Sequence, residues 1–390
     1  MCSKWNTWFK VIQAYRDRSN LLRESLWVDT LEHHRNRRSS LSVSRTDGEE
    51  GIRSTEKRIR GKNVKVAFLH ARNEFTDRML VELRDALIGH ELLSWEVGKT
   101  APATDIEVLL ASGSVRKEQL VDQSKMLLIQ TTTTGYETID VDAASDLGIW
   151  VSYAPSDLTG NATCVAEFVI LLMLGTSRDL AEILRTVRNP GSSAPKIHRS
   201  LNGKTVCIVG LGNIGLQVVD RLRPFGVLLI ATDERPENAP PGVVAFKPNQ
   251  LITAIADADY VVVCARAGKQ NENLIDGKAI RAMKRGAILI NIARGSLVDE
   301  QALLAGLQSG HISAVGLDVQ REEPLTAGNP LLSMPQALLT PHIAAFTDLM
   351  LVGTVGYVAN VIRDLSAGKL PPSLLNRPLK PRGHFHFAIR

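Results

Sequence analysis

The chain has few cysteines and few aromatic residues, and it lacks any long apolar run. Four of its 390 residues are cysteines, and 5% are aromatic. The cysteines lie far apart and form no CxxC pair, which argues against a disulfide framework or a cysteine zinc site and favours a reducing, cytoplasmic location. The longest apolar run, "FVILLMLG" at 168–175, is far shorter than the ~20 residues that span a bilayer. We therefore expect neither a metal site nor a membrane partner.

Basic charge is concentrated at the N-terminal end. The formal net charge is +5, but residues 1–62 carry 14 Lys and Arg against 8 Asp and Glu, so the remainder carries −1. The basic pI therefore does not indicate a nucleic-acid-binding body. Residues 33–62 are polar without a sustained period, which predicts a disordered extension, and residues 8–34 could form an amphipathic helix. A targeting arm, a partner-binding helix and a misassigned start codon all remain open.

From residue 63 onwards, short apolar runs alternate with helical patterns. This alternation is typical of parallel sheets covered by helices. A run rich in Pro, Gly and Ser follows the long helix expected over 161–184, and a second series begins at Val206. The sequence predicts an α/β protein with two Rossmann-like or flavodoxin-like doubly wound domains around a cleft. In the first series we expect strands at 64–70, 106–112, 126–131 and 149–155, a helix at 76–87 opened by Thr76, and a helix at 139–148.

A glycine-rich turn joins the first strand and helix of the second series. In "TVCIVGLGNIG", Gly210 permits the tight turn, Gly212 lets a pyrophosphate approach the backbone, and Gly215 lets helix and strand pack closely. The free N–H groups of the helix would bind the phosphates. An ordinary helix–sheet turn is the alternative. The predicted dinucleotide site comprises Gly210, Gly212, Asn213, Ile214 and Gly215.

Asp233 ends the next strand, 23 residues after Gly210. A carboxylate at this place can accept hydrogen bonds from the ribose hydroxyls of a dinucleotide. Its charge would also repel a 2′-phosphate. We therefore predict NAD as the cofactor in preference to NADP, a preference that Arg235 weakens.

A third feature is the apolar strand in "AILINIARGSLVDE", which ends on Arg294 beside Gly295. In an open parallel sheet, ligands bind outside the carboxyl ends of the strands. The planar guanidinium group suits a carboxylate or a phosphate. Taken alone, this segment fits two interpretations equally well: an anion-binding site and a structural ion pair.

Several segments together resemble the D-isomer-specific 2-hydroxyacid dehydrogenases. They are "NIARGSLVDEQAL", "GLDVQREEPL", "LLTPHIAAFT", "GYETIDVDAASDLGI", "NATCVAEFVILLML" and "GKTVCIVGLGNIG". The resemblance implies an NAD-dependent oxidoreductase of CH–OH donors, which interconverts a 2-keto acid and a D-2-hydroxy acid by hydride transfer, and a homodimer. It also implies a substrate domain at 63–155 and 346–376, an NAD-binding domain at 156–345 and a C-terminal tail at 377–390.

The resemblance implies a catalytic group of Arg294, Glu323 and His342. An imidazole can donate or accept a proton near neutral pH, and a neighbouring carboxylate orients the ring and favours its charged form. Arg294 would bind the substrate carboxylate and polarise the keto oxygen. Glu322 is a rival to Glu323, but the match to an EP dipeptide favours Glu323.

The resemblance also assigns residues around the substrate and the cofactor. Backbone N–H groups at Thr133 and Thr134 would hold the substrate carboxylate. Asn161 would approach the substrate, or it could be a simple helix N-cap. Ala293 and Asp318 would lie near the nicotinamide.

Some positions depart from the family pattern. Cys264 and Arg266 stand where a His-x-Pro run is common; they would border the cofactor, with Arg266 adding a cationic contact and Cys264 packing rather than acting as a nucleophile. Loop 111–114 lacks the arginine of phosphoglycerate-specific members, and Glu323 stands where the formate-specific branch has glutamine. A phosphorylated substrate and formate are therefore both disfavoured. A hydroxypyruvate or glyoxylate reductase and an NAD-binding corepressor or scaffold with weak activity remain alternatives.

Overall fold

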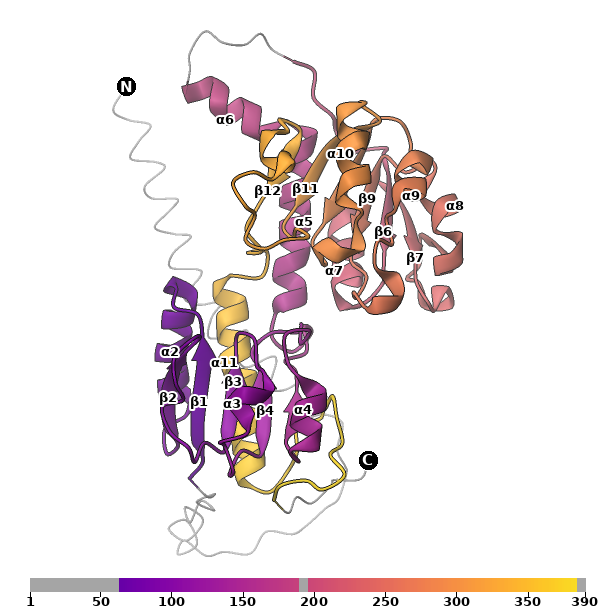
Figure 1. The fold of residues 1–390 in the computed structure, drawn as a ribbon. Helices are drawn as coiled ribbons and strands as arrows, with labels where there is room; N and C mark the ends of the chain where they lie inside the picture. The colour runs from indigo at the N-terminus through magenta and orange to yellow at the C-terminus, as the bar shows by residue number, and fades with distance from the viewer. Residues whose placement is uncertain (1–62, 189–195, 384–390) are drawn as a thin grey trace, which may run out of the picture. The chain divides into compact units, whose positions relative to one another are not determined.

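The computed structural model describes residues 63–188 and 196–383. The predicted extension at 1–62, with its amphipathic helix, lies outside the described residues, as does the end of the tail. The described chain contains two parallel sheets with covering helices, so the predicted α/β class is confirmed (Figure 1). Within these residues, no helix has the length and apolar character needed to cross a membrane.

The first sheet has five parallel strands in the order β2-β1-β3-β4-β5. Strand β3, with the sequence VLLA, is buried throughout, as expected for a parallel strand covered on both faces. Strand β2 forms an edge and is mostly only partly buried, and the sequence pattern did not predict it. The strands are β1 Lys65–His70, β2 Glu91–Glu96, β3 Val108–Ala111, β4 Leu128–Thr131 and β5 Trp150–Ser152, with helices α2 Glu74–Ala86, α3 Lys117–Leu120 and α4 Val141–Asp146.

Helix α2 begins earlier than the sequence predicted. Its N-cap is Asn73, whose side chain accepts a hydrogen bond from the Thr76 N–H, while the Thr76 hydroxyl accepts one from the Asn73 N–H. Thr76 is therefore the third helical residue of a capping box. The prediction that Thr76 opens the helix was wrong, because both residue types favour caps and the reciprocal bond fixes which one caps.

The second sheet has seven parallel strands in the order β12-β11-β10-β9-β6-β7-β8. The order reverses beside β6, since β7 lies on one side of it and β9 on the other. In such sheets the carboxyl ends at the reversal form the ligand site. The strands are β6 Thr205–Val209, β7 Leu228–Thr232, β8 Val243–Phe246, β9 Tyr260–Val263, β10 Ala287–Asn291, β11 Ile312–Leu317 and β12 Ala337–Leu339, with helices α7 Asn213–Leu222, α8 Leu251–Ile255, α9 Gly277–Ala282 and α10 Glu300–Gln308.

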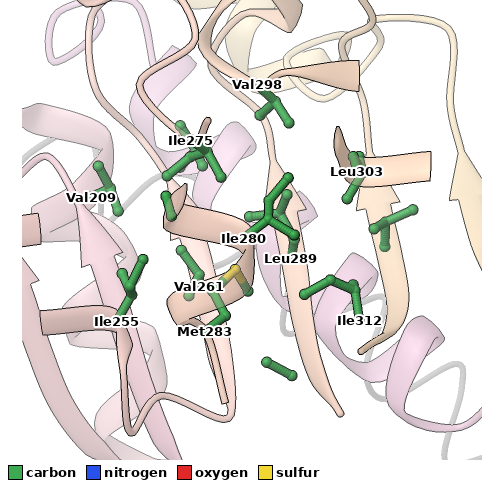
Figure 2. Close-up of a cluster of buried hydrophobic side chains, with 14 of the residues drawn as sticks. Val209, Ile255, Val261, Ile275, Ile280, Met283, Leu289, Val298, Leu303 and Ile312 are labelled. Carbon is green, nitrogen blue, oxygen red and sulfur yellow. The ribbon is translucent and has the colours of Figure 1, made fainter. Parts of the chain in front are cut away.

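Alternating strand residues build two cores on the two faces of this sheet. Val209, Val261 and Leu289 pack against α8, α9 and α10 on one face (Figure 2). Ile208 and Val262 face the other way, into a core shared with helix α5, Asn161–Ser177, and helix α7. Both faces are thus apolar, and the polar residues gather at the carboxyl ends of the strands.

The long helix predicted over 161–184 is two helices. Helix α5 spans Asn161–Ser177 and helix α6 spans Leu180–Arg188. Asp179 lies between them with a φ of 53°, a left-handed conformation that ends the first helix. The prediction of a continuous helix was wrong, since no Gly or Pro marks the break in the sequence.

Helix α11, Asp348–Ser366, packs against α2 and the five-stranded sheet. Its residues Val358 and Ile362 are fully buried in one core with Val66 and Phe68 of β1. The chain therefore returns to the first sheet after completing the second. The predicted domain boundaries near residues 155 and 346 remain a prediction.

Candidate active site

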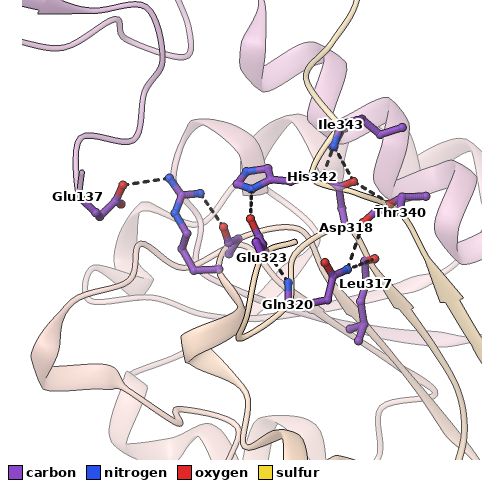
Figure 3. Close-up of polar contacts among 11 residues, drawn as sticks. Glu137, Leu317, Asp318, Gln320, Glu323, Thr340, His342 and Ile343 are labelled. Carbon is purple, nitrogen blue, oxygen red and sulfur yellow. Dashed lines mark hydrogen bonds and ion pairs between the residues drawn. The ribbon is translucent and has the colours of Figure 1, made fainter. Parts of the chain in front are cut away.

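His342 and Glu323 form a close pair (Figure 3). His342 Nδ1 lies 2.7 Å from Glu323 Oε2, and Glu323 Oε1 accepts the Gln320 N–H at 3.0 Å. Nε2 of the same ring has no partner in the described chain. The nitrogen that remains available to a ligand is therefore Nε2. The rival carboxylate, Glu322, makes no bond to the ring.

The pKa of Glu323 reflects opposing effects. Burial alone would raise it, but hydrogen bonds from His342 and the Gln320 amide, together with the charges of His342 and Arg294, lower it below its usual value. Glu323 is thus a charged carboxylate at neutral pH. A carboxylate of this kind holds an imidazole in one orientation and stabilises its protonated form.

Asp318 holds the loop that carries His342. Its buried carboxylate accepts hydrogen bonds from the Thr340 hydroxyl and the Ile343 and Ala344 N–H groups at 2.7–2.9 Å. Its carbonyl accepts the His342 N–H at 2.8 Å, and His342 has a φ of 55°. The described contacts of Asp318 therefore position the histidine, and its predicted place beside the nicotinamide remains a prediction.

Arg294 follows strand β10 in an extended conformation. Its Nη1 donates to the Ala293 carbonyl at 2.7 Å, and its Nη2 lies 3.2 Å from Glu137 Oε2 (Figure 3). The buried amide of Asn291 anchors this corner, because it donates to the Arg294 carbonyl and accepts the Ala293 N–H. Neither Asn291 nor Glu137 was predicted from the sequence.

The glycine beside Arg294 has a steric explanation. A Cβ at Gly295 would collide with the backbone of Gln320 and Arg321. This close approach brings the segment that carries Glu323 against the turn that carries Arg294. Gly295 therefore permits the two catalytic candidates to share one edge of the sheet.

The turn after β4 presents unpaired backbone donors. The N–H groups of Thr133, Thr134, Gly135 and Tyr136 have no acceptor in the described chain. The hydroxyls of Thr133 and Thr134 are turned to the carbonyls of Gly135 and Ala154. Nη2 of Arg294 lies so close to Gly135 that a Cβ there would collide with it. Adjacent free N–H groups and a guanidinium can together bind a carboxylate.

The glycine-rich turn has the geometry of a phosphate site. Gly210 has a φ of +103°, and a Cβ there would meet Ala265. A Cβ at Gly215 would collide with the Gly210 carbonyl, whereas a Cβ at Gly212 would meet nothing within 4 Å. No side chain caps helix α7, and the N–H groups of Asn213 and Ile214 find no acceptor in the described chain. These residues fit a dinucleotide.

Asp233 lies at the end of β7, beside this turn. Its Oδ2 accepts the Leu211 N–H at 2.8 Å, and its Oδ1 accepts the Arg235 N–H at 2.9 Å. The carboxylate therefore stays next to the glycine turn. A cavity of about 170 Å³ lies nearby, lined by Ser156, Asp157, Ala162, Thr163, Asn213, Leu216 and Gln217.

The remaining candidates are placed as follows. Asn161 is the first residue of α5, whose N-cap is Gly160 in a left-handed conformation, so the N-cap explanation of Asn161 was wrong. Its amide has no described partner.

Cys264 packs partly buried against a hydrophobic core, and burial raises its thiol pKa to about 12, as expected for a packing residue. The Arg266 guanidinium lies 5.5 Å from the Tyr136 ring and 5.9 Å from the Tyr153 ring.

Metal-ligating side chains do not gather in the part of the chain that the structure describes. No group of three or more His, Cys, Asp or Glu residues there could hold an ion. The close contact of His342 with Glu323 is the geometry of a proton-transfer pair.

Comparisons with known proteins are consistent with this site. A family model for the NAD binding domain of D-isomer specific 2-hydroxyacid dehydrogenases matches residues 170–344. Glyoxylate reductase of Thermofilum pendens is 30% identical over 310 residues, which cover 77% of this chain and 90% of that protein. D-3-phosphoglycerate dehydrogenase of Mycobacterium leprae is 33% identical over 276 residues, which cover 70% of this chain but 52% of that protein.

Solved structures show the same likeness. The NADPH-dependent glyoxylate/hydroxypyruvate reductase of Sinorhizobium meliloti, in complex with NADP and malonate, has a TM-score of 0.69 at 26% identity, covering 80% of this chain and 96% of that one. D-lactate dehydrogenase of Aquifex aeolicus, complexed with NAD and lactic acid, has a TM-score of 0.67 at 25% identity, covering 78% and 96%. The chain therefore belongs to the D-isomer-specific 2-hydroxyacid dehydrogenase family and carries its NAD(P)-binding, Rossmann-like domain.

Proposed function

We propose that the chain is an NAD-dependent D-2-hydroxyacid dehydrogenase that reduces a small 2-keto acid. The observation that carries this proposal is the His342–Glu323 pair at 2.7 Å, beside an arginine and a turn of free N–H groups. An acid–base group and a carboxylate site are the two parts that keto-acid reduction requires. The glycine-rich turn at 210–215 supplies the third requirement, a dinucleotide site.

In this proposal the residues divide the work of the reaction. A bound nicotinamide cofactor supplies the hydride to the carbonyl carbon. His342 donates a proton from Nε2 to the keto oxygen, so that the π electrons of the C=O bond form the new O–H bond. Glu323 stabilises the charged ring before transfer. In the reverse direction, neutral His342 accepts the hydroxyl proton.

Arg294 and the turn after β4 orient the substrate. The free N–H groups at Thr133 and Thr134 and the Arg294 guanidinium would bind its carboxylate, and Arg294 would also polarise the keto oxygen. Asn161, with an amide that has no described partner, would contact the same ligand. Residues 63–155 and 346–376 would serve as the substrate domain, and 156–345 as the cofactor domain.

A glyoxylate or hydroxypyruvate reductase is the favoured specific form. Glyoxylate reductases of Thermofilum pendens and Pyrococcus horikoshii match this chain over 90% and 85% of their length, whereas the mycobacterial phosphoglycerate dehydrogenases match over about half of theirs. Loop 111–114, "ASGS", has no cation for a substrate phosphate. A small, unphosphorylated 2-keto acid therefore fits best.

NAD is proposed in preference to NADP because of Asp233. Its carboxylate is fixed beside the glycine turn by two backbone N–H groups. It would accept hydrogen bonds from the ribose hydroxyls and repel a 2′-phosphate. Ala293, Asp318, Cys264 and Arg266 are proposed to border the cofactor.

A homodimer is proposed on the basis of helix α6. Ile183, Leu184 and Val187 on this helix are exposed, and the helix buries none of its own residues in the described chain. A symmetric dimer would cover such a face. Leu184→Glu should then give monomers by light scattering. A cytoplasmic location is proposed because the described cysteines are free thiols.

A screen of 2-keto acids with NADH and with NADPH tests the proposed function. We expect oxidation of NADH with glyoxylate, hydroxypyruvate or pyruvate, and a D-hydroxy acid as product where the substrate yields a chiral one. If the chain binds NADH but turns over no 2-keto acid, the proposal fails, and an NAD-binding corepressor or scaffold becomes the better explanation.

A further inference from the structure

Glu137 places a carboxylate of the protein at the guanidinium group of Arg294. Its Oε2 lies 3.2 Å from Arg294 Nη2 (Figure 3). The Glu137 side chain is 47% exposed and has no other partner in the described chain. The contact is therefore a single hydrogen bond between partly exposed groups. An ion pair of this kind contributes little to stability, and Arg294 can exchange it for another partner.

The donor that Glu137 takes is the one that a substrate would need. Nη1 of Arg294 is already directed to the Ala293 carbonyl at 2.7 Å. Nη2 is the atom that lies against Gly135, in the turn of free N–H groups. A ligand carboxylate held by that turn would meet Nη2 from the same side as Glu137. The two carboxylates cannot both take the same N–H direction, and their charges repel at short range.

We propose that Glu137 is an internal carboxylate that competes with the substrate carboxylate for Arg294 and thereby sets the affinity for the substrate. This inference rests on the proposed function. Glu137 is displaced when the keto acid binds and returns when the hydroxy acid leaves. Glu137 is displaced both in the enzyme–substrate complex and in the transition state. It therefore weakens substrate binding without changing the barrier of the chemical step.

The experiment uses the full-length chain and the variant Glu137→Gln, which keeps the size of the side chain and removes its charge. We expect the KM for the best 2-keto acid to fall about two- to five-fold, as expected for removal of a partly exposed ion pair, with kcat little changed. The Kd of oxamate for the enzyme–NADH complex, measured by NADH fluorescence, should fall by the same factor. Glu137→Ala should tighten oxamate in the same direction.

A matched control is Glu82→Gln. Glu82 pairs with Arg78 at 2.7 Å on helix α2, so the same charge is removed from another partly exposed Glu–Arg pair. The control should leave KM and oxamate binding unchanged. In an Arg294→Ala background, Glu137→Gln should lose its effect on oxamate, because the contested donor is gone.

Two outcomes separate this inference from the proposed function. If wild type reduces 2-keto acids but Glu137→Gln weakens oxamate or leaves it unchanged, the competition is wrong and the reaction stands. Weaker binding would identify Glu137 as a residue that positions Arg294. If no keto acid is reduced yet Glu137→Gln still tightens oxamate, the reaction is wrong and the competition stands.

Discussion

His342 Nδ1 lies 2.7 Å from Glu323 Oε2, while the other oxygen of that carboxylate accepts the Gln320 N–H. The pair is therefore fixed from both sides: the backbone holds the glutamate, and the glutamate holds the ring. The Asp318 carboxylate fixes the loop on the far side of His342. These contacts fix the ring and leave Nε2 without a partner in the described chain.

Glu323→Gln should move the falling limb of the reduction profile to lower pH. Burial would raise the pKa of Glu323, but hydrogen bonds from His342 and the Gln320 amide lower it below its usual value, so the carboxylate is charged at neutral pH. Glu323→Gln removes the charge that stabilises the protonated His342 ring. Reduction requires this protonated ring, because His342 donates the proton. The measurement is kcat/KM for reduction as a function of pH.

The same change should alter stability with a defined sign. A carboxyl group whose pKa is lowered by folding stabilises the fold above its ordinary pKa and loses that effect as pH falls through the lowered value. Glu323→Gln should therefore lower Tm at pH 7. The difference in Tm from wild type should disappear as the pH falls through the lowered pKa of Glu323. Glu322→Gln is the control, since it removes a neighbouring charge that makes no bond to His342. A shift of equal size in both variants would contradict the pairing argument.

Arg294→Ala should damage both substrate binding and turnover. The guanidinium is proposed to hold the carboxylate in the ground state and to stabilise charge on the keto oxygen as it develops. We expect a higher KM and a kcat lower by on the order of 10²-fold, as for loss of one charge-stabilising donor. NADH binding, followed by fluorescence, should stay within error. Unchanged kinetics would leave Arg294 as a structural ion-pair residue.

Gly295→Ala should disrupt the site through the backbone. The added Cβ would collide with the Gln320 carbonyl, so the segment bearing Glu323 would have to move. We expect a loss of about 1–3 kcal/mol in the free energy of unfolding, together with reduced kcat. Gly356→Ala is the control. A Cβ at Gly356, in helix α11, would meet nothing within 4 Å, so this substitution should be neutral or stabilising. Urea unfolding and initial rates measure both effects.

Asp233→Ser should shift the cofactor preference toward NADP. The substitution removes the charge that repels a 2′-phosphate, so the ratio of kcat/KM for NADH to that for NADPH should fall on the order of tenfold. Glu234→Ser removes the adjacent, exposed charge and should leave the ratio almost unchanged. A wild type that already prefers NADPH would show that the argument from Asp233 is wrong.

The sequence predicted the parts that depend on local order. The glycine turn is recognisable because strand, turn and helix follow one another, and Asp233 comes at the next strand end. Glu137 was missed because it contacts Arg294 across 157 positions, a pairing that no local pattern contains. The break at Asp179 was missed because neither Gly nor Pro marks it. Strand β2 was missed because an edge strand has a weak apolar pattern.

The activity of His342→Ala with the best 2-keto acid, measured beside its NADH affinity, tests the proposed proton transfer most directly. His342 is proposed to supply the proton, and in the described chain it forms no hydrogen bond with the residues of the glycine turn. We expect kcat to fall by about 10²–10⁴-fold while the Kd for NADH stays close to that of wild type. If turnover with His342→Ala is intact, His342 is not the proton donor, and the proposed reaction mechanism is wrong.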